Sequence, residues 1–296
     1  MKDLLGIHSM GRLDIEGLMA DSTSMRTAIE GGHPVTQSLD GVCVANLFFE
    51  PSTRTRLSFD LAAQRLGGHV ITLHPDASST AKGESLRDTV LTVAGIGADI
   101  LVVRHGLEGA PRSIADWTGL PVVNAGDGTN EHPTQALLDA VTLQRRFGAT
   151  DGLAMAVVGD IAHSRVAGSL LHAMPALGVD LTLVGPEEWL PDDAPAPTTT
   201  NLDDLLTEVD VVYLLRVQTE RGGVISDDYI ARYRLDRERS ARLAPNAVIM
   251  HAGPINRGVE ISDEVAESPR SLIVEQVRNG VPVRMAVLKA LAEGRT

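Results

Sequence analysis

The sequence predicts an α/β protein with two doubly wound domains, each built on a mostly parallel sheet, with interdomain helices joining them. Short apolar runs rich in Val, Ile and Leu recur along the whole chain, and a segment long enough for a helix separates each run from the next. Strands that are apolar on both faces are typical of parallel sheets covered by helices on both sides. The 296 residues are enough for two domains of ordinary size.

Eight apolar runs are expected to be strands, four in each half of the chain. In the first half they are Val42–Phe48, Val70–Leu73, Ile100–Val103 and Pro121–Asn124. In the second half they are Leu153–Gly159, Leu181–Val184, Val211–Leu215 and Ala247–His251. The polar segment Pro191–Thr200 is expected to be an exposed loop within the second half, because strand patterning resumes directly after it.

Two helices are expected at the points that organise the chain. The first covers Ala136–Phe147 and connects the two halves, with Pro133 suited to its first turn and Gly148 able to end it. The second is an amphipathic helix over Val283–Leu291, close to the C-terminus. We therefore expect the domains to be connected by helices rather than by a flexible linker.

Composition bounds the class of protein. Hydrophobic residues make up 43% of the chain and charged residues 22%, which is typical of a soluble globular protein. The single cysteine, Cys43, cannot form an internal disulfide and fits a reducing compartment. The apolar stretch at the N-terminus is too short for a signal peptide. No run of apolar residues approaches the 18 residues expected of a membrane-spanning helix. We expect a cytoplasmic protein, and the net charge of −13 disfavours nucleic-acid binding.

The segment Phe49–Arg56 (F-E-P-S-T-R-T-R) is the most informative part of the chain. It follows the first predicted strand, turns through Pro51 and opens a helix. The first backbone N–H groups of a helix have no intrahelical partners, and together with the helix dipole they favour an anion. Three hydroxyl groups add further donors. They belong to Ser52, Thr53 and Thr55.

Two arginines follow in the same segment. The guanidinium of Arg54 is a planar fork suited to phosphate oxygens. Arg56 lies about 200° around the helix from Arg54, so both cannot hold one ligand, and Arg54 is the expected contact. Plain N-capping is the structural alternative for such a helix start. With two cations and three hydroxyls at a strand end, an anion site is the better interpretation.

The stretch F-x-E-P-S-T-R-T-R-x-S-F resembles the carbamoyl-phosphate signature of the aspartate and ornithine carbamoyltransferases. The likeness extends over essentially the whole chain. It implies a carbamoyl-phosphate-binding domain over residues 1–133, which the C-terminal helix over residues 280–296 rejoins. It also implies an aspartate-binding domain over residues 134–279.

Three further residues in the first half match family ligands of carbamoyl phosphate. Arg104 follows the strand Ile100–Val103 and matches an arginine that contacts this substrate, although a salt bridge would explain a strand-end arginine equally well. His132 and Gln135 belong to the segment H-P-T-Q. The matching histidine donates to the carbamoyl oxygen, where negative charge grows, and the matching glutamine accepts from the carbamoyl NH2.

A polar segment over residues 78–86 (S-S-T-A-K-G-E-S-L) would by itself be interpreted as a solvated turn. It also matches a mobile loop of the family, whose serine and lysine enter the active site of a neighbouring subunit. The matching lysine is Lys82. The serine is Ser78, with Ser79 as the alternative. The resemblance therefore implies a homotrimer with shared active sites.

In the second half, Gly159–Arg165 (G-D-I-A-H-S-R) follows a strand and opens a helix. The segment lacks the G-x-G-x-x-G pattern of dinucleotide-binding proteins. In the resembled family the arginine that matches Arg165 binds the α-carboxylate of the amino acid.

The segment R-V-Q-T-E-R begins at Arg216, directly after an apolar strand. If the chain stays extended there, Arg216 and Gln218 lie on one side, where a guanidinium and an amide can hold a carboxylate. An ordinary surface R-x-Q is the structural alternative. The pattern resembles the aspartate branch of the family, and the S-M-G and H-C-L-P segments of the ornithine branch are absent.

The turn His251-Ala252-Gly253-Pro254 occupies the place of the family's H-P-x-P segment, with Ala252 in place of the first proline. The resemblance implies substrate contacts from backbone carbonyls here, at Ala252 and Gly253. Gly253–Pro254 can supply a cis peptide bond.

Together these residues predict transfer of the carbamoyl group of carbamoyl phosphate to the amino group of L-aspartate, a step of pyrimidine biosynthesis. No metal or organic cofactor is expected, and a regulatory chain or a dihydroorotase could be a partner. Three alternatives are an ornithine-type or other carbamoyltransferase, a nucleotide-binding oxidoreductase, and an inactive paralogue that serves in assembly. The missing glycine pattern disfavours the second, and the intact set of basic residues disfavours the third.

Overall fold

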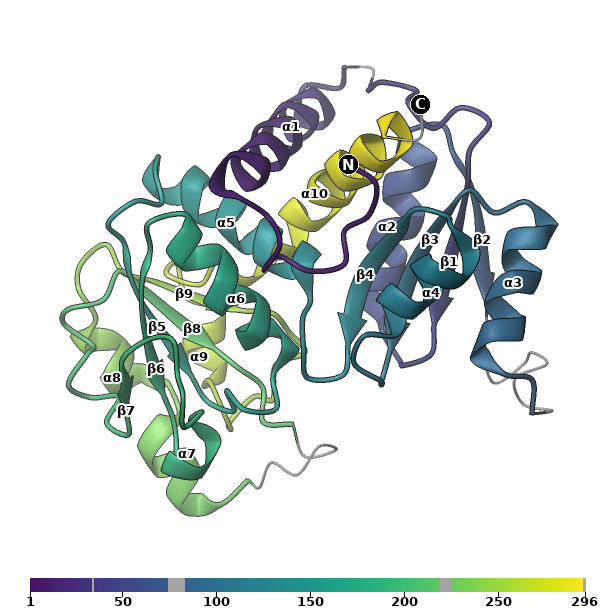
Figure 1. Ribbon diagram of the computed structural model, residues 1–296. Helices are drawn as coiled ribbons and strands as arrows, with labels where there is room; N and C mark the ends of the chain where they lie inside the picture. Colours follow the sequence, from purple (N-terminus) through teal and green to yellow (C-terminus); the bar gives the residue numbers. More distant parts are fainter. Residues whose placement is uncertain (34, 74–82, 219–224, 295–296) are drawn as a thin grey trace. The chain divides into compact units, whose positions relative to one another are not determined.

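The computed structural model of the chain describes residues 1–33, 35–73, 83–218 and 225–294 (Figure 1). These residues form two compact units. Unit 1 consists of Met1–Val141 together with the residues from Val277 onward, and unit 2 consists of Thr142–Gln276. Both divisions fall inside helices, one between Val141 and Thr142 and the other between Gln276 and Val277, where the sequence analysis expects boundaries after residues 133 and 279.

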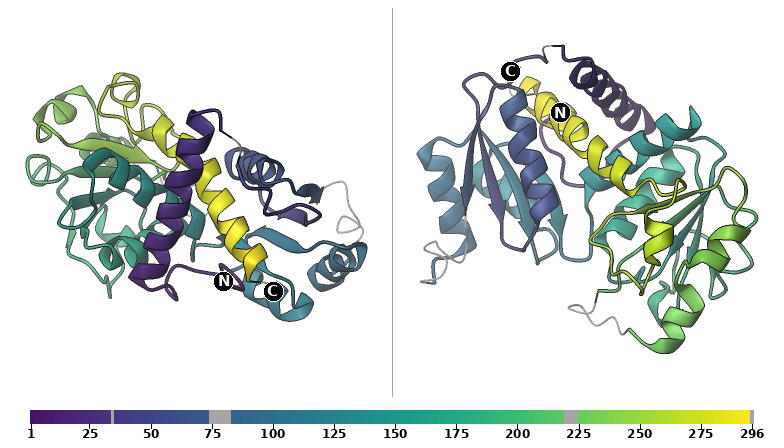
Figure 2. Two further views of the ribbon diagram at one scale, coloured as in Figure 1. Left: turned by 90° about the horizontal axis from the view of Figure 1, so that it is seen from above. Right: turned by 180° about the vertical axis from the view of Figure 1, so that it is seen from behind.

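Unit 1 is built on a four-stranded sheet with the order β2-β1-β3-β4, in which all neighbouring strands are parallel. Its strands are β1 (Cys43–Phe48), β2 (His69–Leu73), β3 (Ile100–His105) and β4 (Val122–Asp127). Helices α3 (Leu86–Ile96) and α4 (Ala110–Thr118) cover one face, and α2 (Thr53–Arg65) lies on the other (Figures 1 and 2). An aliphatic core fills the space beneath α3 and α4.

Unit 2 is built on a five-stranded sheet with the order β7-β6-β5-β8-β9, again with only parallel pairings. Its strands are β5 (Ala154–Val158), β6 (Asp180–Val184), β7 (Thr198–Thr199), β8 (Val211–Leu214) and β9 (Val248–His251). The helical segments are α6 (Arg165–Ala176), η3 (Glu187–Trp189), α7 (Asp227–Tyr233), α8 (Arg237–Arg242) and α9 (Asp263–Ala266). The predicted class, two doubly wound α/β domains with parallel sheets, is confirmed.

Three helices complete the helical layer of unit 1. They are α1 (Arg12–Glu30), the first part of α5 (Pro133–Phe147) and most of α10 (Ile273–Glu293). In both views of Figure 2, α10 runs beside α1. The side chain of Arg26 on α1 donates to Asn279 on α10, and Lys289 on α10 lies 3.0 Å from Asp21. None of the helices in the described part of the chain is long and apolar enough to span a membrane.

In each sheet there is one pair of neighbouring strands from which the chain continues outward in opposite directions. The first connection in unit 1 leads from β1 to β2 on one side, and the next strand, β3, lies on the other side of β1. In unit 2 the reversal falls between β5 and β8. Parallel sheets bind ligands at the carboxyl ends of their strands, at such reversal points. The fold therefore directs attention to the residues that follow β1 and β3 and those that follow β5 and β8.

Three expectations from the sequence are corrected. Strand β3 extends to His105 and so includes Arg104, because the main chain keeps its ladder beyond the apolar run: Phe48 pairs with Arg104, and Phe49 N–H donates to its carbonyl over 2.9 Å. The segment Pro191–Thr200 is not entirely a loop, since Thr198 and Thr199 form β7 beside β6. The last helix begins at Ile273.

That helix is also not simply amphipathic. Every residue from 282 to 288 is buried, including Arg284. The guanidinium of Arg284 lies 5.1 Å from the centre of the Phe59 ring on α2. The sequence indicated one apolar stripe, but in the fold α10 is covered over its whole circumference in this region.

Candidate active site

The segment after β1 forms the helix start that the sequence predicts. Ser52 precedes α2 with an extended backbone (φ −159°, ψ 103°), and its side chain makes no capping hydrogen bond. The hydroxyl of Ser52 therefore leaves the first N–H groups of α2 to another acceptor. Thr53 is exposed and Thr55 is buried. This is the geometry in which the start of a helix receives an anion.

Arg54 lies in the first turn of α2, with an exposed side chain. Protein on its inner side partly desolvates the guanidinium and lowers the pKa of Arg54 below its ordinary value. Arginine remains a cation at neutral pH even so. The residue therefore presents a fixed positive charge at the helix start, where it can add to the backbone donors.

Arg104 lies beside this helix start, because β3 is the neighbour of β1 and Arg104 pairs with Phe48 at its end. Its Nε atom is 3.5 Å from Oε2 of Glu50, a residue of the β1–α2 turn. The structure thus brings Ser52–Thr55 and Arg104 to the ends of two adjacent strands at the reversal point of unit 1.

His132 and Gln135 follow β4, the neighbour of β3 on its other side. His132 directly precedes Pro133, the first residue of α5, and Gln135 lies in the first turn. Both side chains are buried. They belong to the same carboxyl edge of the sheet as the helix start of α2 and Arg104.

Buried carboxylates that the sequence did not single out fix the backbone around His132. Glu131, 1% exposed, accepts from Ile7 N–H over 2.7 Å and lies 2.5 Å from Nδ1 of His8. Asp127 accepts from the N–H groups of Glu131 and Gly109. The N-terminal segment and the end of β4 are therefore tied to the residue that immediately precedes His132.

Ser78 and Lys82, expected from the matched loop, lie outside the residues that the structure describes, as does the alternative Ser79.

In unit 2, Arg165 is the first residue of α6 and is buried. Ser164 caps this helix, since its hydroxyl accepts from Ala167 N–H over 3.3 Å. Arg216 and Gln218 follow β8 and lie on one side, as the extended spacing predicts. Nη2 of Arg216 donates to Oε1 of Gln218 over 2.9 Å. Because β5 and β8 are neighbours, the three side chains belong to the reversal point of unit 2.

Two buried carboxylates hold the main chain of this segment, and sequence reasoning missed both. Asp160 accepts from Gln218 N–H over 2.9 Å and lies 2.6 Å from Nδ1 of His163. Glu260 accepts from Val217 N–H over 3.1 Å, and burial raises its pKa above the ordinary value. For Asp160 a signal existed, namely a carboxylate directly after an apolar strand. For Glu260 the contact spans distant segments and leaves no spacing to detect.

The turn after β9 has the conformation that the sequence allowed. The Gly253–Pro254 peptide bond is cis. Gly253 N–H donates to Nδ1 of His251 over 2.7 Å, and His251 N–H donates to Oε1 of Gln276 over 3.0 Å. Ala252 and Gly253 thus stand at the end of the strand next to β8, with a backbone held by His251.

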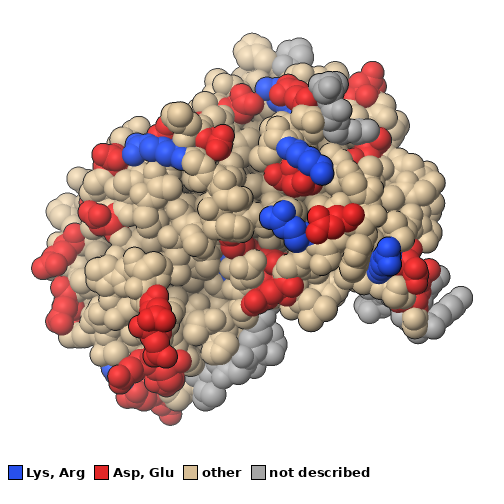
Figure 3. All heavy atoms as spheres, viewed as in Figure 1, with Lys and Arg blue, Asp and Glu red and all other residues tan. Residues whose placement is uncertain are grey.

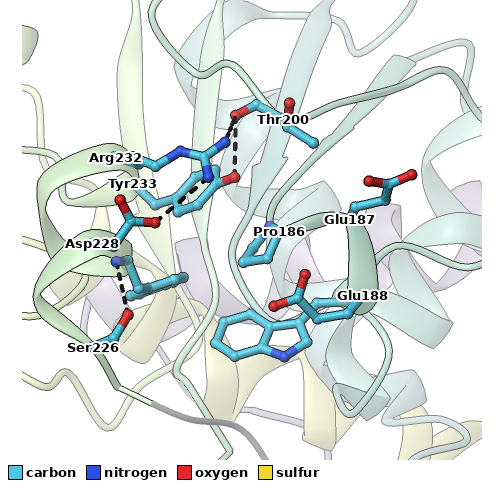
Figure 4. A pocket seen from close by; sticks show the side chains of 10 residues that line it. Pro186, Glu187, Glu188, Thr200, Ser226, Asp228, Arg232 and Tyr233 are labelled. Carbon is cyan, nitrogen blue, oxygen red and sulfur yellow. Dashed lines mark hydrogen bonds and ion pairs between the residues drawn. The ribbon is translucent and has the colours of Figure 1, made fainter.

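A separate hollow of unit 2 lies between η3, Thr200 and α7 and contains none of the predicted site residues (Figure 4). Its carboxylates include Glu187, Glu188 and Asp228, and acidic side chains gather over this part of the surface (Figure 3). Its arginine, Arg232, already contacts Asp228 and the carbonyl of Thr200. Such a hollow repels anions, so it does not compete with the strand ends as a site for them.

The chain has two doubly wound domains, one with an open helix start and one with an arginine–amide pair at the strand ends, and both arrangements suit anionic ligands. The chain belongs to the aspartate/ornithine carbamoyltransferase family. Residues 2–145 match its carbamoyl-P binding domain and residues 151–291 its Asp/Orn binding domain. The family predicted from the sequence is confirmed.

Among its relatives, the aspartate carbamoyltransferase catalytic subunit of Salinispora tropica is 50% identical, over 97% of this chain and 98% of that one. Among solved structures, aspartate transcarbamoylase from Trypanosoma cruzi in complex with carbamoyl phosphate and aspartate matches with a TM-score of 0.91 and 32% identity, over 98% and 95% of the two chains. The catalytic subunit of M. jannaschii aspartate transcarbamoylase matches with a TM-score of 0.88 and 38% identity, over 99% of each chain.

Proposed function

We propose that this chain transfers the carbamoyl group of carbamoyl phosphate to the amino group of L-aspartate, giving N-carbamoyl-L-aspartate and phosphate in de novo pyrimidine biosynthesis. The observation that carries the choice of acceptor is the 2.9 Å hydrogen bond between Arg216 and Gln218. A guanidinium held beside an amide suits a side-chain carboxylate and repels the ammonium group of ornithine. The names of the similar proteins support the same acceptor.

Unit 1 supplies the residues for carbamoyl phosphate. The phosphate is bound by the first N–H groups of α2, by the hydroxyls around it and by Arg54. Those hydroxyls belong to Ser52, Thr53 and Thr55. Arg104 contacts both the phosphate and the carbonyl oxygen.

The chemistry at the carbonyl carbon needs little beyond positioning and electrostatics. His132 donates to the carbamoyl oxygen as negative charge develops there, and Gln135 accepts from the carbamoyl NH2. The amine nitrogen attacks the carbon, the bond to the phosphate oxygen breaks, and the departing phosphate accepts the proton of the amine. Loss of one such oxyanion donor typically raises the barrier by about 3 kcal/mol.

Unit 2 supplies the residues for aspartate. Arg165 binds the α-carboxylate, and Arg216 with Gln218 binds the side-chain carboxylate. The carbonyl groups of Ala252 and Gly253 orient the amino acid through its amine. The buried Asp160 and Glu260 keep the Val217–Gln218 backbone in place for this task.

An acceptor assay tests the function. Purified protein and carbamoyl phosphate are incubated with aspartate, ornithine or N-acetylornithine, and the carbamoylated product and phosphate are measured. We expect turnover with aspartate alone. Turnover with ornithine and none with aspartate would refute the acceptor assignment while leaving the family intact.

We further propose that the working unit is a cytoplasmic homotrimer in which Ser78 and Lys82 of one chain complete the site of the next. A cyclic assembly lets each chain give one loop and receive one. The single Cys43, partly buried and with its pKa raised by burial, is compatible with a reducing compartment.

Two inactive variants test the sharing of sites. Arg54→Ala disables a chain's own phosphate site, and Lys82→Ala disables only the loop that it donates. After dissociation and reassembly of a mixture, some sites combine an intact Arg54 with an intact Lys82, so activity should reappear. Verified mixed trimers that are no more active than the parents would show that Lys82 does not act across chains.

A further inference from the structure

A buried carboxylate, Asp139, lies next to the proposed carbamoyl site. Asp139 lies one helical turn after Gln135 on α5, and Nε2 of Gln135 donates to Oδ1 of Asp139 over 3.1 Å. Asp139 is 0% exposed and Gln135 is 7% exposed. A hydrogen bond so deep in the protein is not exchanged for one with water, so it constrains the orientation of the amide.

A buried cation on another helix interacts electrostatically with Asp139. Arg284 on α10 is 3% exposed, and burial lowers its pKa to about 10, an effect that the charge of Asp139 opposes. Gly280, one turn before Arg284, leaves room for the guanidinium, because a Cβ at that position would lie 2.6 Å from Nη1 of Arg284. Arg284 thus remains a cation at neutral pH, and a neighbouring cation favours the ionised form of a carboxyl group.

The charge state of Asp139 decides which way the Gln135 amide faces. An ionised carboxylate only accepts hydrogen bonds, whereas an amide has an NH2 donor and an oxygen acceptor on opposite sides of one carbon. Gln135 must therefore turn its NH2 group toward Asp139, and its Oε1 atom faces away. A neutral amide at position 139 would satisfy either orientation.

We infer that Asp139 makes this site selective for a carbamoyl group, because it accepts from the NH2 group of Gln135 and so turns the acceptor atom of that amide toward the substrate. The inference rests on the proposed function. A carbamoyl group offers an NH2 donor where an acetyl group offers a methyl group. Oε1 of Gln135 accepts a hydrogen bond from the NH2 group of a carbamoyl group but gains none from a methyl group. A reversed amide would place its own NH2 group against the NH2 group of the substrate. Asp139 acts through Gln135 and is a positioning residue.

The test uses acetyl phosphate, which has a methyl group in place of the NH2 of carbamoyl phosphate. The dissociation constants of both compounds are measured by calorimetry, and their ratio reports selectivity. In Asp139→Asn we expect the preference for carbamoyl phosphate to fall about tenfold, the effect of one buried hydrogen bond. A merely structural role would weaken both compounds equally and leave the ratio unchanged, and that result would overturn the inference.

Further variants keep the test decisive. Arg284→Met should lower the ratio as Asp139→Asn does, whereas Arg284→Lys should retain most of the wild-type ratio. The matched control is Arg26→Met, which removes another buried arginine, one that donates to Asn279 on α10, and it should leave the ratio unchanged. In a Gln135→Ala background Asp139→Asn should have no effect on the ratio, and an equal effect there would contradict a role through Gln135. Failure of the wild-type protein to bind carbamoyl phosphate or carbamoylate aspartate would instead refute the proposed function.

Discussion

The reversal points of the two units are built differently around the same element, a helix that starts at the end of a strand. In unit 1 the side chain of Ser52 makes no capping bond to α2, so the first N–H groups are left to a ligand. In unit 2 the hydroxyl of Ser164 accepts from Ala167 N–H and caps α6. An open helix start can bind a phosphate through the backbone, whereas a capped start leaves recognition to side chains.

The arginines of the two units also differ in how firmly the protein holds them. Arg54 is exposed in the first turn of α2, but Arg165 is buried and Arg216 is hydrogen-bonded to Gln218. Bidentate recognition of a carboxylate depends on a fixed guanidinium plane. In unit 2 the bond to Gln218 orients the guanidinium of Arg216, and Asp160 and Glu260 hold the adjoining backbone by accepting from Gln218 N–H and Val217 N–H. The two units therefore offer anions two different kinds of site, backbone dipoles in one unit and preset side-chain forks in the other.

The largest expected effect comes from removing one arginine in each unit. Arg216→Ala should lower kcat/KM for aspartate by about 100-fold, because a charge-assisted contact contributes on the order of 3 kcal/mol. Carbamoyl phosphate binding to the free enzyme should barely change. Arg54→Ala should produce the reverse pattern, with weak binding of carbamoyl phosphate. Calorimetry and initial rates measure both, and equal loss of both affinities in Arg216→Ala would contradict the division of labour.

A smaller effect is expected from salt. The chain carries a net charge of −13, so the arginines must reverse the potential locally to capture anions. The Debye length falls from about 30 Å at 0.01 M to about 10 Å at 0.1 M salt. Inorganic phosphate and succinate should compete with the substrates, and substrate affinity should weaken several-fold over this range. Affinities that stay flat or improve would disprove local reversal of the field.

The two helix starts offer a matched pair of serine variants. Ser164→Ala should lower the free energy of unfolding by about 1 kcal/mol, the usual effect of a lost N-cap bond. Ser52→Ala should change stability much less, since no cap is lost, but it should weaken phosphate binding. Denaturant unfolding and phosphate titration of both variants give the comparison. Equal destabilisation by the two substitutions would show that the helix starts do not differ.

The smallest effect concerns pH. Burial raises the pKa of Glu260, so the folded protein holds this proton more tightly than the unfolded chain. Its contribution to stability is present below the ordinary carboxyl pKa and is lost as pH rises through the raised value. The stability of wild type relative to Glu260→Gln should therefore decline over that range in thermal unfolding.

The opposite sign is expected at Asp203, which serves as the control. A hydrogen bond from Arg239 lowers the pKa of Asp203. Its contribution is present above the ordinary carboxyl pKa and is lost as pH falls through the lowered value. A parallel trend in Glu260→Gln and Asp203→Asn would show that these pKa shifts do not govern the response.

Local patterns made much of the fold and the family predictable. Long apolar strands and the F-x-E-P-S-T-R-T-R-x-S-F stretch are continuous in sequence, and each carries its own signal. Strand β7 escaped prediction because Thr198–Thr199 has no apolar period and exists only through its pairing with β6. The pattern over Val283–Leu291 predicts an amphipathic helix, because nothing in the sequence shows that Arg284 packs against the Phe59 ring on α2.

The site residues that belong to a short sequence motif were predictable. The supporting residues that contact them from distant parts of the sequence were not. Arg216 and Gln218 are two residues apart, and an extended backbone is enough to bring them together. Glu260 reaches Val217 from 43 residues away, and Glu131 meets Ile7 across 124 residues. No spacing rule connects such pairs, because the sheet order and the crossovers determine them.

The division of α10 has a consequence for the order of synthesis. The chain begins unit 1 at Met1, but this unit also needs the residues from Val277 onward, among them the buried stretch 282–288. Unit 2 is complete once Gln276 has been made. On the ribosome the domain that is started first is therefore finished last. Until then the surfaces of α1, α2 and α5 that α10 will cover stay open to water, an exposed apolar face of the kind that draws chaperones to a nascent chain.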